Sequence, residues 1–237
     1  MQHEMLGIIA MYVITLVLAI PLGRYIAKVY SNEHVWTDTL FNPIEKIFFR
    51  LSHIDATREM NWKQHMVALL TINLLWFLWA MFCLMNQGWL PLNPDHNPSQ
   101  TSDLAFNTAI SFIVNCNLQD YSGETGASYF SQVFCLQYMQ FVSAATGMAA
   151  AAIVFNSLRD RTTDKLGNFY NYFVKSLIRI LLPLCIVMAL IQVFNGSPMT
   201  FHGKDVMTSV QGDTMNVSRG PVAAFMAIKH LGTNGGG

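Results

Sequence analysis

The chain has 237 residues, of which 52% are hydrophobic and only 12% are charged, and its formal net charge is zero. Soluble domains carry about 25% charged residues, so this composition argues against an ordinary soluble domain, and the neutral charge argues against a nucleic-acid partner. The apolar residues are gathered in blocks of about 20 residues, the length that crosses a bilayer. The chain is therefore predicted to be an all-α membrane protein.

The first block, 6–30, is predicted to be a leading transmembrane helix. No lysine or arginine precedes it, and its later part, LAIPLG, does not resemble a signal-peptide cleavage site. We therefore expect a retained membrane anchor rather than a cleaved signal peptide. The connection 31–63 follows, and its sequence FNPIEKIFFRLS predicts an amphipathic helix along the cytoplasmic surface, in contact with lipid or with a partner subunit.

Three further blocks, near 64–87, 128–157 and 172–194, complete a set of four predicted transmembrane helices. The third contains several polar residues, and because polar groups are costly against lipid, this helix is expected to face protein or water. Two interpretations stay open for it: a buried helix held by side-chain hydrogen bonds, or the lining of a transport pathway. Its polar residues are Gln132, Gln137, Gln140, Ser143 and Thr146.

The distribution of lysine and arginine predicts the orientation of these helices. One group of basic residues lies between spans one and two and another between spans three and four, whereas the stretch 88–127 has none. Because basic residues favour the cytoplasmic side, the N-terminus and the stretches 88–127 and 196–237 are predicted to lie outside. Three basic residues in 196–237 depart from this trend. The inner groups are Arg24, Lys28, Lys46, Arg50, Arg58 and Lys63, then Arg159, Arg161, Lys165, Lys175 and Arg179.

Each of the two outer stretches contains an apolar segment that is too short to span the bilayer. In the first, residues 104–114 are predicted to form a short helix that is capped by Thr101 or Ser102. In the second, Ser218 is the expected cap and Pro221 the expected first-turn residue. Both segments are therefore expected to be re-entrant or interfacial half-helices.

An offset of 118 residues aligns the two half-helices and the irregular stretches that follow them. Three of the thirteen pairs from 105 to 117 are identical. The C-terminus of a half-helix favours a cation, and irregular backbone at membrane depth is tolerated only where it lines a cavity. Its carbonyl oxygens can there replace the hydration shell of an ion, as in potassium-channel filters. The aligned ends are Asn115, Cys116 and Asn117 opposite Thr233, Asn234 and Gly235.

The strings NCNLQDYSGE and HLGTNGGG, with one leading span and the 118-residue offset, resemble the potassium-binding A subunits of Kdp-type potassium-transporting ATPases. The resemblance covers the whole chain. It implies a channel-like fold in which four helix–pore loop–helix repeats form one pore after a leading helix. It also implies potassium as the transported ion, held by backbone carbonyls, and no organic cofactor. The implied filter residues are Asn115, Cys116, Asn117, Thr233, Asn234 and Gly235, and the implied supporting residues are Gly232 and Gln119.

The same resemblance implies partners and a location. Such a subunit selects potassium from outside and passes it to a separate P-type ATPase catalytic subunit, which uses ATP to drive uptake. Small accessory membrane subunits belong to the same complex, which lies in the bacterial cytoplasmic (inner) membrane. The chain itself has no Asp-Lys-Thr-Gly phosphorylation motif and no Walker motif, so no catalytic residues of its own are expected.

The predicted domains are 1–30, the connection 31–63, one complete repeat at 64–157, a cytoplasmic connection at 158–171, and an incomplete second repeat at 172–237. Because four repeats are needed to close the pore, we expect the chain to be an N-terminal fragment of such a subunit. The final glycines then form the edge of a filter rather than a linker or a phosphate-binding loop. Two alternative functions stay open: a stand-alone potassium or sodium symporter of the same fold, and a membrane scaffold that binds no ion.

Overall fold

The computed structural model describes residues 2–116, 118–160 and 162–232. Within these residues most of the chain is helical, and four helices are long and apolar enough to cross a membrane. The chain divides after Asp55 into two compact units. The prediction of an all-α membrane fold is confirmed, with one short two-stranded hairpin as an addition that the sequence did not predict.

The first unit contains α1 (Gln2–Tyr30) and α2 (Asp38–Ser52). The most apolar window of α1 has no buried residue among those described, which is the pattern of a helix that meets lipid on all sides. α2 carries charged residues between apolar ones at helical spacing, so it is the amphipathic helix predicted within 31–63. The hydroxyl of Tyr25, in the last turns of α1, lies 3.0 Å from the hydroxyl of Thr37, the N-cap residue of α2, and the two share a hydrogen bond.

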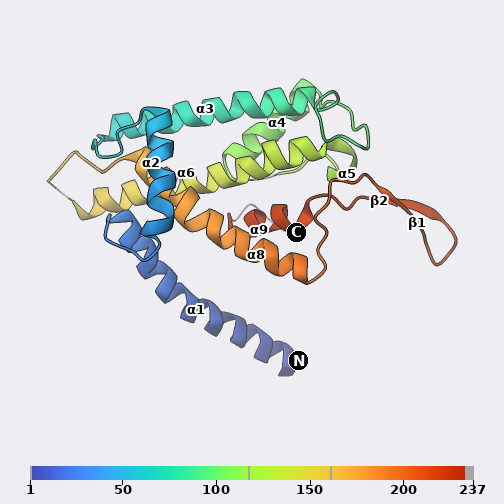
Figure 1. Cartoon of the computed structure of the whole chain (residues 1–237), viewed down its shortest axis with the longest axis horizontal. Helices are drawn as coiled ribbons and strands as arrows, with labels where there is room; N and C mark the ends of the chain where they lie inside the picture. Colours follow the sequence, from blue (N-terminus) through green and yellow to red (C-terminus); the bar gives the residue numbers. More distant parts are fainter. Residues whose placement is uncertain (1, 117, 161, 233–237) are drawn as a thin grey trace. The chain divides into compact units, whose positions relative to one another are not determined.

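The second unit repeats one arrangement, in which a short helix packs between longer ones (Figure 1). The short helix α4 packs against both α3 and α6, and the short helix α9 packs against α8 and against η1, the first part of the third span. Its helices and strands are α3 (Trp62–Asn86), α4 (Ser102–Ile113), α5 (Gly123–Gly126), η1 (Ser131–Gln137), α6 (Tyr138–Arg159), α7 (Phe169–Lys175), η2 (Ser176–Leu181), α8 (Leu182–Phe194), β1 (Asp205–Thr208), β2 (Thr214–Val217) and α9 (Val222–Leu231).

The third and fourth spans each contain a π-helical segment. η1 continues directly into α6, and η2 joins α7 to α8, so the spans run without a break over Ser131–Arg159 and Phe169–Phe194. In a π-helical turn the backbone bonds run from residue i to i+5, and such turns are frequent at functional sites. Composition does not distinguish them from α-helix, and the sequence did not predict them.

Gln87, at the end of α3, organises the outer loop 88–127. Its side chain is fully buried, and its Nε2 donates to the carbonyls of Pro98 at 2.7 Å and Gly126 at 2.9 Å. Its Oε1 accepts from the N–H of Ser128 at 3.1 Å. One side chain therefore fastens three points of the loop, and α4 starts from a fixed position.

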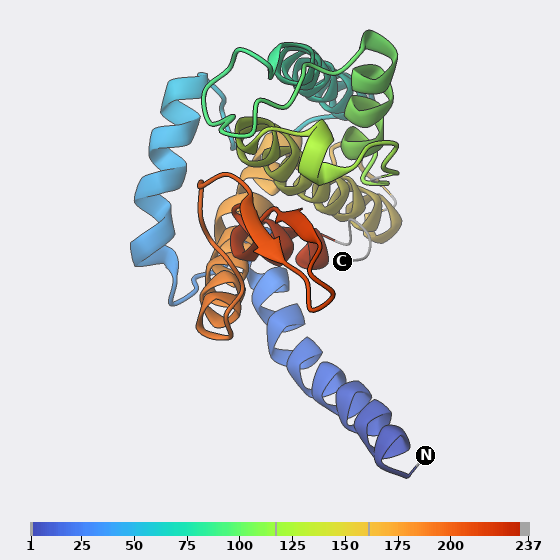
Figure 2. The same ribbon diagram turned by 90° about the vertical axis from the view of Figure 1, so that its right-hand side faces the viewer.

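The segment before α9 folds onto this outer loop. The backbone N–H of Lys204 donates to the Asp95 carboxylate at 2.9 Å, and the Tyr129 hydroxyl donates to the His202 carbonyl at 2.9 Å. The hairpin of β1 and β2 follows, and it lies at the same end of the unit as α5 (Figure 1), the end that faces the viewer in Figure 2. The two stretches that were predicted to share one side of the membrane therefore lie together.

The predicted N-cap position is correct for α4 but wrong for α9, and neither helix has a side-chain capping bond. α4 does begin at Ser102 with Thr101 in the N-cap position, but the Thr101 side chain makes no capping hydrogen bond. α9 begins directly after Pro221, which occupies the N-cap position rather than the first turn, so Ser218 lies too far upstream to cap it. The physical reason is the turn at Gly220, whose φ of +59° redirects the chain between Ser218 and the helix.

Candidate functional site

The first predicted filter segment begins with a tight reversal at the end of α4. Asn115, which follows the C-cap Val114, has a φ of +59°, a left-handed conformation that asparagine adopts more readily than most residues. The Asn115 N–H donates to the Phe112 carbonyl at 3.2 Å, and the Cys116 N–H donates to the Ser111 carbonyl at 2.9 Å. This pair of bonds is the Schellman motif, which ends the helix and turns the chain back.

Ser111 fastens this segment to α4 on both sides of Asn117. Its carbonyl accepts from the backbone of Cys116, and its hydroxyl donates to the Leu118 carbonyl at 3.1 Å. Ser111 is buried, whereas Cys116 is exposed and carries a free thiol. Asn117 itself lies outside the described residues.

The second predicted segment follows α9. The helix ends at Leu231, and the N–H of the C-cap Gly232 donates to the Ile228 carbonyl at 2.7 Å. Gly232 is buried, with a φ of −77°. Outside the described part of the chain lie the predicted filter residues Thr233, Asn234 and Gly235.

A side-chain bridge brings the ends of the two half-helices together. The Nδ2 amide of Asn115 donates to the Gly232 carbonyl at 3.0 Å, across 117 positions of the sequence. The Oδ1 of the same amide accepts from the hydroxyl of Ser143, in α6, at 3.0 Å. The structure therefore places the predicted filter residue Asn115 in contact with the predicted supporting residue Gly232.

A cavity of about 480 Å³, the inner cavity, borders this bridge. Asn115, Ser143 and Gly232 line it, together with small residues of α6 such as Gly147. Of the polar residues predicted to face protein or water, Gln140, Ser143 and Thr146 are buried, and that expectation is confirmed. Ser143 both forms an internal hydrogen bond and lines this cavity, so it does not decide between the two interpretations of the third span.

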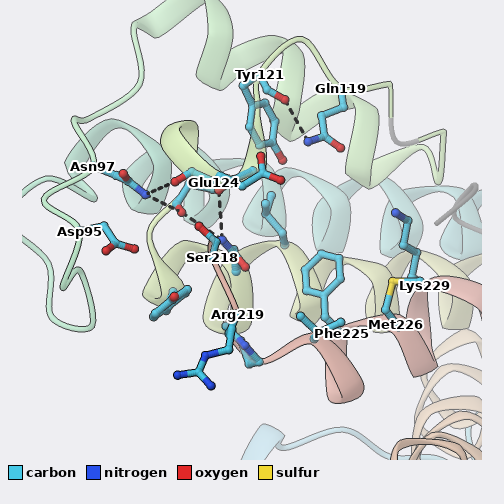
Figure 3. A pocket seen from close by; sticks show the side chains of 18 of the residues that line it. Asp95, Asn97, Gln119, Tyr121, Glu124, Ser218, Arg219, Phe225, Met226 and Lys229 are labelled. Atoms are coloured by element: carbon cyan, nitrogen blue, oxygen red, sulfur yellow. Dashed lines mark hydrogen bonds between the residues drawn. The ribbon is translucent and has the colours of Figure 1, made fainter. Parts of the chain in front are cut away.

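Gln119 lies at a different cavity, the outer cavity, which has a volume of about 430 Å³ (Figure 3). Its side chain is exposed, and its Nε2 donates to the Tyr121 carbonyl at 2.9 Å. The third span contributes Gln132 and Gln140 to the lining of the same cavity. The hydrogen bond described for Gln119 thus joins it to a residue of its own loop and not to the bridge between Asn115 and Gly232.

The outer cavity is lined by two acidic and two basic residues, so its formal charges balance. The Ser122 hydroxyl and the backbone N–H of Glu124 donate to the Glu124 carboxylate and lower its pKa. Burial raises the pKa of the Tyr129 hydroxyl, and the nearby Asp95 carboxylate raises it further. The charged lining residues are Asp95, Glu124, Arg219 and Lys229.

Sequence reasoning did not connect two serines to the site. Ser143 was recognised as a polar residue of an apolar span, but its partner was not, because Asn115 lies on another element. Ser111 was missed entirely. The only local signal for it is a serine in the last turn of a short helix, and its bond to Leu118 depends on the chain reversal at Asn115.

The arrangement offers neutral oxygen and nitrogen atoms at the ends of two helices. No cluster of three or more His, Cys, Asp or Glu side chains suited to a metal ion occurs among the described residues. The C-termini of α4 and α9 both reach the bridge, and this end of a helix carries partial negative charge. Backbone carbonyls placed there can coordinate a cation.

Comparison with known proteins identifies the family. Residues 9–237 match the family model of the potassium-transporting ATPase A subunit. Similar proteins, each named potassium-transporting ATPase potassium-binding subunit, come from Flavobacterium psychrophilum (62% identical), Bacteroides thetaiotaomicron (52%) and Pseudomonas entomophila (43%). Each match covers 100% of this chain but only 41–42% of the relative, so the chain spans about two fifths of the length of these relatives. Because the family match includes nearly every residue, the chain belongs to the potassium-transporting ATPase A subunit family.

Proposed function

We propose that this chain supplies part of the potassium filter of a potassium-binding subunit in an ATP-driven uptake complex. The observation that carries the proposal is the contact between Asn115 and Gly232, which joins the ends of two half-helices beside a cavity. The printed names of the relatives, which specify potassium binding and an ATPase, support the choice of ion and of complex.

The proposed filter holds potassium by backbone carbonyl oxygens. A potassium ion entering the filter loses its water, and carbonyl oxygens replace its hydration shell. The partial negative charge at the C-termini of α4 and α9 stabilises the ion further. Gly232 and Gln119 support the filter, and two further repeats outside this chain complete the pore. The proposed carbonyl donors are Asn115, Cys116, Asn117, Thr233, Asn234 and Gly235.

The selected ion then passes to a separate P-type ATPase subunit, which couples ATP hydrolysis to uptake, with small accessory membrane subunits in the same complex. The complex lies in the bacterial inner membrane. The N-terminus and the loop 88–127 face outside, because that loop has no basic residue whereas basic residues cluster at the opposite connections. The contacts between the loop and the segment before α9 support a common outer side for both.

The first test is Gly235→Asp in the complete subunit, assembled with its P-type ATPase subunit, with rubidium uptake by potassium-starved cells as the measurement. A carboxylate at this position removes the freedom that glycine gives the backbone and adds charge beside the ion. We expect apparent affinity to fall by about tenfold or more, equivalent to about 1.4 kcal/mol, and sodium to compete better.

The matched control is Gln211→Asp in the hairpin turn. Gln211 is exposed and does not have a positive φ, so this substitution adds a carboxylate to the same outer segment without straining the backbone. Uptake by this variant should match the wild type. Unaltered affinity and selectivity in Gly235→Asp would contradict the filter assignment. Uptake that continues without the P-type subunit would support the symporter instead, and equal thermal stability in potassium and in sodium would support the scaffold.

A further inference from the structure

We propose that Ser143 is a positioning residue for ion selection, which acts through the side chain of Asn115 on the carbonyl of Gly232. The three residues form what we call the Ser143–Asn115–Gly232 bridge. The proposal rests on the proposed function and deepens it, because it names a residue outside both filter segments that determines how the segments are held together.

The direction of each hydrogen bond determines what the bridge does. The Asn115 amide has one acceptor and one donor end, and the Ser143 hydroxyl, at 3.0 Å, donates to the acceptor end Oδ1. The donor end Nδ2 is thereby turned toward the Gly232 carbonyl, also at 3.0 Å. A flipped amide would place two oxygens against each other at Gly232. The Gly232 carbonyl, which can only accept, therefore selects this amide orientation, and the Ser143 hydroxyl holds the amide in place through its Oδ1 end.

Three separate elements meet at the bridge, and each is held independently. Ser143 is buried in α6 and only 5% exposed. Asn115 is fixed by the Schellman motif at the end of α4, so the direction in which its side chain leaves the backbone is determined. Gly232 is fixed by the bond of its N–H to the Ile228 carbonyl of α9. The remaining freedom is rotation of the Asn115 side chain, and the Ser143 hydroxyl restricts it.

The bridge ends on a carbonyl that directly precedes the second predicted filter segment. A peptide unit is planar, so holding the Gly232 carbonyl oxygen also orients the peptide group that leads into residues 233–235. The first segment begins at Asn115 itself. One chain of two hydrogen bonds thus sets the entry of one segment relative to the start of the other, and this relative position determines the size of an ion site built from both.

A competing hydrogen bond makes the role of Ser143 testable. Its hydroxyl also lies 3.3 Å from the Gln140 carbonyl of its own helix, a common partner for serine within helices. If that bond were its function, loss of the hydroxyl would change stability or assembly but leave the ion preference of the assembled complex unaltered. If the bridge is its function, ion preference changes.

The experiment compares Ser143→Ala, Ser143→Thr and Thr146→Val in the complete subunit within its complex. Thr146 lines the same inner cavity, and its hydroxyl donates to the Val142 carbonyl of its own helix at 2.7 Å, so its loss removes a buried hydroxyl without touching the bridge. The measurements are apparent KM and maximal rate for rubidium uptake, and inhibition by sodium.

We expect Ser143→Ala to raise apparent KM about three- to tenfold, the range of one buried hydrogen bond, and to reduce discrimination against sodium by a similar factor, with a maximal rate within about twofold of wild type. Ser143→Thr keeps the donor, and because Ser143 lines the inner cavity the substitution has space for one methyl group, so it should restore both values. Thr146→Val should match the wild type in ion preference. Should Ser143→Ala not assemble, Ser143→Cys, a weaker donor of similar size, replaces it and should show a smaller change of the same kind.

The outcomes separate the bridge from the filter. If Gly235→Asp impairs selectivity while Ser143→Ala behaves as Thr146→Val does, the bridge is overturned and the proposed filter stands. A lower maximal rate with unaltered KM and sodium inhibition in Ser143→Ala also overturns it. If Gly235→Asp is without effect, the proposed function fails and the bridge fails with it.

Discussion

The two half-helices agree at their C-terminal ends and differ at their N-terminal ends. With the offset of 118 residues, Ile113 aligns with Leu231, and these are the last residues of α4 and α9. Ala105 and Ala223, which also align, are both 0% exposed. The correspondence found in the sequence therefore describes equivalent packing and equivalent helix ends.

The chain enters the two half-helices by different routes. α4 follows the outer loop that Gln87 fastens at three points, whereas α9 follows an exposed hairpin and the turn at Gly220. The C-terminal end, which leads into the bridge, is therefore alike in the two half-helices. The segment that leads into the N-terminal end differs between them. Three tests follow, of the different N-terminal segments and of the equivalent packing of the two half-helices.

The largest loss of stability is expected from Gln87→Leu, which removes the hydrogen bonds that hold the outer loop before α4 and changes nothing before α9. The substitution leaves the buried Ser128 N–H without this partner and also breaks the partly buried bond to the Pro98 carbonyl. An orphaned buried group costs about 1–3 kcal/mol and a further lost hydrogen bond about 1 kcal/mol, so we expect a loss of about 2–4 kcal/mol. Thermal unfolding of the purified complete subunit in detergent measures it. The control Asn195→Leu changes an exposed amide at the end of α8, which donates to the Ile191 carbonyl of that helix. Equal losses in both variants would show that Gln87 does not hold the loop.

A moderate and equal effect is expected from Ala109→Leu in α4 and Ala227→Leu in α9, which test the equivalence. These aligned residues are 0% and 3% exposed, and overfilling a packed site costs about 1–3 kcal/mol. Ala19→Leu, on the exposed surface of α1, is the control and should leave the unfolding temperature unchanged. A marked cost in only one half-helix, measured by the same thermal unfolding, would show that the two are not packed alike.

The smallest effect is expected from Asp103→Asn, which tests the difference at the first turn. The Thr101 hydroxyl, followed by the N–H groups of Asp103 and Leu104, lowers the pKa of the Asp103 carboxylate, whereas the first turn of α9 has no acidic residue. A lowered pKa stabilises the fold above the unfolded-state pKa of about 3.9, and this contribution is lost as pH falls through the folded-state pKa. Asp103→Asn should therefore melt slightly below wild type at pH 7 and together with it at acid pH. A gap that widens on acidification would contradict this.

The long spans were predictable because the hydropathy of 20 or more residues outweighs local detail. The block predicted near 64–87 is Trp62–Asn86, and the block near 172–194 lies within Phe169–Phe194. The short helix predicted at 104–114 is also present, as Ser102–Ile113. In each case the physical signal is a run of apolar residues that ends where polar loop residues begin.

Features that depend on distant partners could not be read from the sequence. The strands of the hairpin are four residues long and largely exposed, so no alternation of buried and exposed residues marks them. The bond from Asn115 to Gly232 crosses 117 positions, and the bond from Ser143 to Asn115 crosses 28. Local composition predicted which loops matter, and only the packing of α4, α6 and α9 shows which atoms meet.

The π-helical start of the third span accommodates one extra residue without turning its cavity face away. Gln132, Leu136 and Gln140 all line the outer cavity, although residues eight apart on a regular α-helix drift by about 80° around its axis. The wider turn of η1 offsets that drift. Deleting one residue between Gln132 and Gln140 within η1 would leave these glutamines seven positions apart, and residues at that spacing on a regular α-helix differ by only about 20° around its axis. Both glutamines would therefore stay on the cavity face. A gap of one position in an alignment of this stretch thus exchanges a wide turn for a regular one and leaves the two ends of the cavity lining in register.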